Sequence, residues 1–376
     1  MYIERYLEQG IMAKWADGRA VIIYGPRRVG KTTLLKQIKS KIEGKTMLVN
    51  GEDAGIRSWL ASQSVAELKS HLAGVNTLMI DEAQRVEQVG LNIKLIVDNI
   101  AGIKVVATGS SSFELANQVG EPLVGRKWSY YLLPLAQLEL GKKELPYETK
   151  QNLAERLVYG GYPEVVTERN VVGKEEILGE ILDSYLFKDL LEIEEIKRSD
   201  ILVKMLKMLA FQIGDQVSWR ELSNSLGIGV GTVERYLDLL EKVYVIKRLG
   251  GYSGNLRQEL TKTGRYYFVD LGIRNAVVNN FNNLETRNDV GQLWENYLFM
   301  ERLKRQSCKK IRSNIYFWRT YDQQEIDLVE EREGKLFGFE FKWGKKIRKA
   351  PKIWLKTYAN AEYEVINQEN YLEFVG

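Results

Sequence analysis

The sequence predicts an α/β protein whose first part is a doubly wound parallel sheet. Short apolar runs alternate with helical patterns between residues 20 and 112, and this alternation indicates parallel strands with helices on both faces. Residues 199–284 have the pattern of two helices followed by a hairpin, and residues 285–376 that of a long helix followed by strands. We therefore expect a helical and winged-helix region and then a second, smaller α/β domain.

The expected strands of the first part are short apolar runs that end in small or polar residues. The first, "AVIIYG", is followed by a helical pattern of Leu34, Leu35, Ile38 and Ile42. The next elements are a strand over 46–50, a helix over 64–72, and strands over 76–86 and 103–112. Ligands bind at the carboxyl ends of the strands in such sheets, so the polar endings should form a site.

The middle of the chain is predicted to be mainly helical, with a turn at "GGYPE" (160–164) and an amphipathic helix over 175–196. Residues 217–249 contain a short helix, a glycine-bearing turn, a second helix starting near Thr232, and a strand. That order is typical of a helix-turn-helix. A tip at 250–255 and a returning strand at 266–270 would complete a winged helix. Arg235, Lys242, Lys247 and Arg248 could then contact DNA phosphates or simply face solvent.

The last part is expected to begin with a helix that carries an apolar stripe. The predicted elements are this helix over 290–306, strands over 314–320, 324–331 and 335–344, and a fourth strand over 361–367. The length of 376 residues exceeds what one hydrophobic core usually supports. We expect the domains to span residues 1–145, 146–198, 199–284 and 285–376.

Composition narrows the class of protein. Hydrophobic residues make up 44% of the chain and charged residues 28%, as in an ordinary folded protein. The net charge of +4 permits nucleic-acid binding without requiring it. One cysteine and one histidine exclude an internal disulfide and a cysteine- or histidine-rich metal centre. No leader-like or membrane-spanning apolar run is present, so we expect a cytoplasmic protein without membrane contact.

The stretch "YGPRRVGKTT" has the spacing of a phosphate-binding loop. Gly25 and Gly30 let backbone N–H groups point at phosphate oxygens, Lys31 adds positive charge, and Thr32 places a hydroxyl on Mg²⁺. The helix that starts there adds its positive dipole end. The residues expected to bind the ATP cofactor in this loop are Gly25, Pro26, Arg27, Arg28, Val29, Gly30, Lys31, Thr32 and Thr33.

Two later strands should complete the nucleotide site. In "LMIDEA", Asp81 can hold Mg²⁺ through water and Glu82 can act as the general base for the attacking water. In "ATGSSS", Thr108 or Ser110 could bind the γ-phosphate or the attacking water, and the same segment could cap a helix. Arg126, in "LVGRKW", either reaches the γ-phosphate of a neighbouring subunit as a catalytic arginine or is a surface residue.

These motifs resemble those of AAA+-type P-loop ATPases. "YGPRRVGKTTLL", "IDEAQRV", "TGSSS", "VGRKW", "LPL" and "GGYPEVV" together resemble a widespread prokaryotic family of such ATPases that carries a C-terminal domain of unknown function. The resemblance covers nearly the whole chain. It implies ATP and Mg²⁺ as cofactors, possible homo-oligomers, and a role for Arg126 as the catalytic arginine. An obvious second sensor arginine in a helical lid is absent from this sequence.

The C-terminal part places acidic residues and a lysine on neighbouring elements. Glu295 lies on the expected helix, Asp327 on one strand, and Glu340 and Lys342 on the next. Residues two apart on a strand point to one face, so these side chains should meet. Carboxylates could hold Mg²⁺, and a lysine could activate water. Glu325 points to the same face as Asp327 and could assist.

This pattern resembles the PD-(D/E)XK nuclease fold, a restriction-endonuclease-like α/β fold. The resemblance implies Glu295, Asp327 and Glu340 as metal ligands and Lys342 as a catalytic residue. The sequence thus predicts a Mg²⁺-dependent ATPase that acts on DNA through a nuclease-like domain. The alternative is a regulatory ATP switch that binds DNA or protein partners without cutting, in which the same charges form cross-strand ion pairs.

Overall fold

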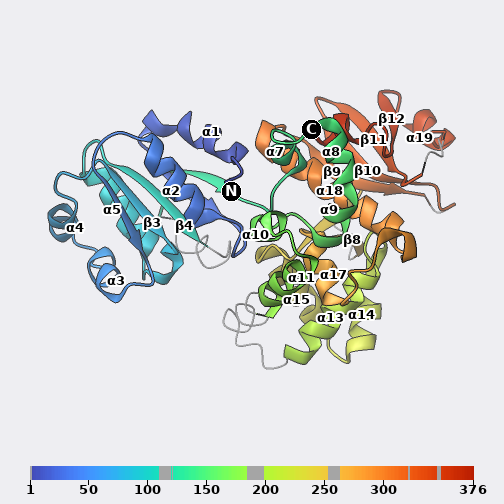
Figure 1. Ribbon diagram of the computed structural model, residues 1–376, viewed down its shortest axis with the longest axis horizontal. Coiled ribbons are helices and arrows are strands. Elements are labelled where there is room, and N and C mark those ends of the chain that lie inside the picture. The colour runs from blue at the N-terminus through green and yellow to red at the C-terminus, as the bar shows by residue number, and fades with distance from the viewer. Residues whose placement is uncertain are drawn as a thin grey trace. The chain divides into compact units, whose positions relative to one another are not determined.

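The structure is a computed structural model, and we describe its residues 2–109, 120, 122–183, 199–252, 263–320, 322–344 and 349–376. The chain divides into two compact units (Figure 1). The first contains residues 1–133 and 242–244, and the second contains residues 134–241 and 245–376. The predicted helix over 175–196 lies outside the described residues beyond position 183, and so does the tip of the predicted winged helix from residue 253.

The first unit is built on a five-stranded parallel sheet in the order β2-β3-β4-β1-β5. Its strands are β1 (Ala20–Tyr24), β2 (Thr46–Asn50), β3 (Thr77–Asp81), β4 (Lys104–Gly109) and β5 (Lys127–Tyr131). Its helices are α1 (Tyr6–Met12), α2 (Lys31–Lys41), α3 (Ala54–Leu60), α4 (Val65–His71) and α5 (Val89–Asn99). The predicted parallel sheet is confirmed, and the structure adds β5, which the sequence did not indicate.

Helices cover both faces of this sheet, as a doubly wound fold requires (Figure 1). Ile23 and its face of the sheet pack against Leu34 and Leu35 of α2 and against α1. Ile22 points the other way and joins the core formed with α3, α4 and α5. Because the central strands β1, β3 and β4 are buried on both faces, they read as continuous apolar runs in the sequence.

The second unit combines many helices with one mixed sheet. Its helices are α7 (Gln137–Leu140), α8 (Pro146–Gln151), α9 (Leu153–Tyr159), α10 (Pro163–Thr167), α11 (Val171–Ile181), α13 (Ser199–Phe211), α14 (Trp219–Leu226), α15 (Val230–Lys242), α17 (Leu271–Val277), α18 (Val290–Lys309), α19 (Lys352–Thr357) and α20 (Tyr371–Val375). Its strands are β6 (Gln216–Ser218), β7 (Ile246–Gly251), β8 (Thr263–Phe268), β9 (Asn314–Arg319), β10 (Glu325–Arg332), β11 (Lys335–Phe341) and β12 (Ala361–Ile366).

These seven strands form one sheet in the order β12-β11-β10-β9-β7-β8-β6. β10 and β11 are joined by a two-residue turn, Glu333–Gly334, in which both residues have positive φ angles of 50° and 75°. That turn matches the twist of an antiparallel hairpin. β7 and β9 pair in parallel at Gly250–Tyr316 and Gly251–Phe317. The strands of the predicted winged helix and those of the C-terminal part therefore belong to a single sheet.

Candidate functional site

The predicted phosphate-binding loop connects β1 to α2 in the first unit. Gly30 precedes the helix with a φ angle of 97°, a conformation that favours glycine, and Arg28 also has a positive φ angle of 57°. The Lys31 ammonium donates to the carbonyl oxygens of Gly25 at 2.9 Å and Pro26 at 2.8 Å. The loop thus curls around the ammonium that is expected to meet the phosphates.

Asp81 accepts hydrogen bonds from two of the hydroxyl groups that were predicted to lie in the nucleotide site. Its Oδ2 accepts a hydrogen bond from Thr32 Oγ1 at 2.6 Å, and its Oδ1 accepts one from Thr108 Oγ1 at 2.5 Å. Asp81 ends β3, and Thr108 lies near the end of β4, the next strand in the sheet. Parallel pairing places the two strand ends together, and α2 brings Thr32 to the same point. Ser110, the other candidate, lies outside the described residues.

Glu82, the predicted general base, follows Asp81 with a left-handed backbone, φ 50°. Its carboxylate accepts a hydrogen bond from Gln84 Nε2 at 2.6 Å. Gly51 is required beside it, since an added Cβ would lie 2.4 Å from the Glu82 carbonyl oxygen. Sequence reasoning did not single out Gln84 or Gly51, because neither belongs to the loop or to the acidic strand end.

Arg126 lies just before β5 and bonds to Asp98 of α5, with 2.8 Å between its Nε and the Asp98 Oδ1. Both side chains are substantially exposed to solvent. Within one chain this is a surface ion pair, which matches the alternative in which Arg126 is a surface residue. The catalytic role in a neighbouring subunit stays a prediction.

The C-terminal acidic residues meet around an arginine that the sequence analysis had not considered. Arg265 of β8 donates from Nη1 to Glu295 at 3.1 Å and to Asp327 at 3.2 Å. Its Nη2 donates to Glu325 at 2.9 Å. The Arg265 side chain is only 4% exposed, so its charge is balanced by these carboxylates rather than by water. We call Arg265, Glu295, Glu325 and Asp327 the Arg265 cluster.

Burial and mutual repulsion shift the pKa values in the Arg265 cluster. Burial, followed by the charge of Asp327, raises the pKa of Glu295 to about 8. Arg265 and a hydrogen bond from the Tyr267 hydroxyl at 2.7 Å oppose that rise. Burial alone would lower the pKa of Arg265, but Tyr267 and the carboxylates raise it above its ordinary value. Arg265 therefore stays charged.

Glu340 and Lys342 flank a residue that contacts this cluster, but their side chains bond to each other. Lys342 Nζ is 2.7 Å from Glu340 Oε1. Asp327 Oδ2 accepts a hydrogen bond from the backbone N–H of Phe341, the residue between them, at 2.8 Å. Among the described residues, no three or more histidine, cysteine, aspartate or glutamate side chains are grouped to hold a metal ion. The metal-binding roles of Glu295, Asp327 and Glu340 stay predictions.

The predicted recognition helix, α15, presents mainly acidic side chains to solvent. Glu234, Arg235 and Asp238 are exposed. Lys247 pairs with Glu241 at 2.5 Å, and the Arg248 guanidinium lies over the Trp219 ring at 5.2 Å. Carboxylates repel DNA phosphates, so this face of the helix is poorly suited to enter a groove.

Three protein families match successive parts of the chain. Residues 17–141 match an AAA domain, residues 150–284 match a domain of unknown function, DUF8612, and residues 290–370 match another, DUF4143. The AAA match coincides with the parallel sheet, the phosphate-binding loop and the Asp81 site. The first unit is therefore a P-loop ATPase domain of the AAA type.

Two uncharacterized proteins are similar to most of this chain. An uncharacterized protein of Mycobacterium tuberculosis, Rv2008c, is 27% identical over 327 residues, covering 86% of this chain and 70% of its own. An uncharacterized protein of Haemophilus influenzae is 27% identical over 356 residues, covering 89% of this chain and 84% of its own. Among solved structures, the Walker-type ATPase PABY2304 of Pyrococcus abyssi is 16% identical with a TM-score of 0.49, covering 74% of this chain and 96% of that one.

Proposed function

We propose that the protein is a Mg²⁺-dependent ATP-hydrolysing switch whose second unit binds a partner without cutting it. The observation that carries the ATPase part is the convergence of Thr32 and Thr108 on Asp81, at 2.6 Å and 2.5 Å. A hydroxyl and a carboxylate this close are oxygen donors that suit Mg²⁺. The AAA match over residues 17–141 supports the same reading.

The residues of the first unit have distinct roles in this proposal. The loop N–H groups and Lys31 bind the phosphates. Thr32 and Asp81 would hold Mg²⁺, which would offset the charge that develops on the transferred phosphoryl group. Glu82 takes the proton of the attacking water. Gln84 Nε2 donates to one Glu82 oxygen at 2.6 Å, which orients the carboxylate and leaves its other oxygen to accept the proton.

The Arg265 cluster supports the non-cleaving alternative for the second unit. A nuclease of the resembled type needs carboxylates that are open to a cation, whereas Glu295, Glu325 and Asp327 here share a buried guanidinium. The neighbouring Glu340 and Lys342 are likewise joined in an ion pair, at 2.7 Å, as the non-cleaving alternative expects. The partner is DNA or a protein, and the acidic face of α15 favours contact elsewhere if the partner is DNA.

The test is to measure ATP hydrolysis, DNA binding and DNA cleavage on the same full-length chain with Mg²⁺ or Mn²⁺. Lys31→Ala should reduce hydrolysis by at least about 100-fold, since a charge that stabilises the transition state is lost. Lys36→Ala, on the exposed face of the same helix, should leave it unchanged. Neither plasmid nor single-stranded DNA should be cut.

Two outcomes would contradict the proposal. Equal hydrolysis by wild type and Lys31→Ala would remove the ATPase assignment. Cleavage that disappears in Lys342→Ala would establish a nuclease in place of a non-cleaving switch. Retention of DNA on a gel by wild type and Lys342→Ala alike would identify DNA as a partner, and analytical ultracentrifugation with ATP would test the expected homo-oligomer.

A further inference from the structure

A buried arginine near the N-terminus, Arg5, is bonded to the phosphate-binding loop. Its side chain is almost fully buried and donates from Nη1 to the Val29 carbonyl oxygen at 3.0 Å. From Nη2 it donates to the Leu133 carbonyl oxygen at 2.5 Å. A buried guanidinium is held firmly by such acceptors, because leaving its donors unpaired would be costly. Arg5 therefore ties the loop to the point where the chain leaves the first unit.

The residue before Leu133 contacts the start of the same loop. Leu132 N–H donates to the Tyr24 carbonyl oxygen at 2.7 Å. A Cβ added to Gly25 would lie 2.2 Å from the Leu132 carbonyl oxygen, so only glycine allows this close approach. Gly25 thus has a second reason to be glycine besides binding phosphate.

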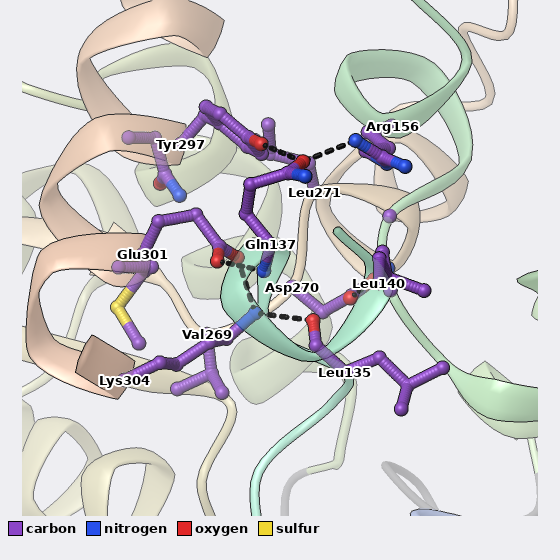
Figure 2. A pocket seen from close by; sticks show the side chains of 14 residues that line it. Leu135, Gln137, Leu140, Arg156, Val269, Asp270, Leu271, Tyr297, Glu301 and Lys304 are labelled. Atoms are coloured by element: carbon purple, nitrogen blue, oxygen red, sulfur yellow. Dashed lines mark hydrogen bonds and ion pairs between the residues drawn. The ribbon is translucent and has the colours of Figure 1, made fainter. Parts of the chain in front are cut away.

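The chain then enters the second unit and is held again within two residues. Leu135 N–H donates to the Gly161 carbonyl oxygen at 2.7 Å, and its own carbonyl accepts from Lys304 Nζ at 3.2 Å. Gln137 N–H donates to Glu301 Oε2 at 2.6 Å (Figure 2). These groups line a cavity of about 20 Å³, which is room for roughly one water molecule.

Side chains connect this second anchor to three helices. The Gln137 Oε1 accepts from Tyr297 of α18 at 3.0 Å and from Arg156 of α9 (Figure 2). Gly161 N–H donates to Asp270 Oδ2 at 2.7 Å, and Asp270 caps the start of α17. Each anchoring side chain is buried. A displacement of residues 135–137 would therefore change the hydrogen bonds that these residues make with α9, α17 and α18.

We propose that residues 132–137, the strap, carry the nucleotide state of the first unit into the second, and that Arg5 is the positioning residue that couples the strap to the loop. Only Pro134 separates the two anchored ends, and its ring fixes φ, so the strap has little slack. When phosphates accept hydrogen bonds from the loop N–H groups, the loop backbone at Val29 moves, and Arg5 transmits this movement to Leu133. This inference rests on the proposed ATPase function.

The test is amide hydrogen exchange of the full chain with and without Mg²⁺ and a non-hydrolysable ATP analogue. In wild type, the analogue should change exchange at Leu135, Gln137 and Gly161. In Arg5→Gln it should still bind, but that change should be lost, and ATP hydrolysis should fall about tenfold because two charged hydrogen bonds are removed. Arg57→Gln is the matched control, since Arg57 donates to the Glu52 carbonyl at 2.7 Å outside the strap, and it should respond as wild type does.

The outcomes separate this inference from the proposed function. Binding of a fluorescent ATP analogue without any exchange change in wild type, or an unchanged response in Arg5→Gln, would overturn the strap alone. Failure of wild type to bind the analogue would overturn the ATPase proposal and the strap with it. If Arg5→Gln does not fold, Arg5→Lys keeps the charge but cannot span both carbonyls, so its response should be reduced, and a full response would overturn the strap.

Discussion

Two carboxylate sites in this protein have similar origins in the sequence and opposite surroundings in the structure. Asp81 ends a buried strand and accepts hydrogen bonds from two hydroxyls, Thr32 and Thr108. Asp327 lies on a buried strand and shares the guanidinium of Arg265 with two other carboxylates. The hydroxyl groups are neutral, so the negative charge of Asp81 remains available to bind a cation. The positive charge of Arg265, by contrast, already neutralises much of the negative charge of Glu295, Glu325 and Asp327. The partner decides what an acidic residue at a strand can do.

The largest effect should come from removing the charge at the first site. Asp81→Asn keeps the size of the side chain but weakens its hold on Mg²⁺, so ATP hydrolysis should fall by at least about 100-fold. Initial rates at saturating ATP with varied Mg²⁺ measure this. Asp17→Asn, which removes an exposed carboxylate paired with Arg19 at 3.3 Å, should hydrolyse ATP at the wild-type rate. If Asp81→Asn hydrolyses ATP at a rate close to that of Asp17→Asn, the charge of Asp81 is not needed to bind Mg²⁺ for hydrolysis.

The second site should respond in stability instead of activity. Arg265→Met leaves buried carboxylates without their cation and should lower the free energy of unfolding by about 3–5 kcal/mol. Urea denaturation measures it, and Mg²⁺ or Mn²⁺ should raise the melting temperature of Arg265→Met but not of wild type. Arg319→Met, an exposed change that loses a 3.1 Å bond to Gln216, is the control. Equal stability of the two variants would show that the guanidinium is not what holds the cluster.

The smallest effect is expected at Arg126, which separates the two readings of that residue. Its exposed ion pair with Asp98 contributes no more than about 1 kcal/mol, so Arg126→Ala should unfold close to wild type. Dilute protein should hydrolyse ATP at the wild-type rate, as a surface arginine implies. If Arg126→Ala hydrolyses ATP more slowly than wild type only at high protein concentration, Arg126 is the catalytic arginine of an oligomer. A slower rate at every concentration would contradict both interpretations.

The fold of the first unit was predictable because its central strands, β1, β3 and β4, are buried on both faces. Strands such as β1 and β2 appear as apolar runs between helical patterns, and their bounds lie within a residue of those expected. β5 was missed because "KWSYY" is an edge strand with partly exposed side chains, which weakens the apolar signal. The C-terminal strands were found from their alternation and from the glycine turn at Gly334.

The Asp81 site was predictable because parallel strands in one sheet bring their ends together whatever the detailed register. The Arg265 cluster was not, since it depends on contacts between distant segments. Arg265 is 62 positions from Asp327, and it lies one residue before the returning strand that the sequence predicts over 266–270. Spacing shows which residues share a face of one strand, but it does not show which side chain from another element will compensate them.

No helix within the described ranges is long and apolar enough to cross a membrane.

The pairing of β7 with β9 has a consequence for dividing the chain into fragments. Cutting the chain between residues 284 and 285, at the predicted boundary, would separate β7 from β9. Each piece would then have an exposed strand edge with unpaired backbone groups, to which strands of other chains could bind. The C-terminal piece would also lose Arg265 and keep three acidic side chains facing one another. The last two predicted domains should therefore be produced as one piece for any study of either part.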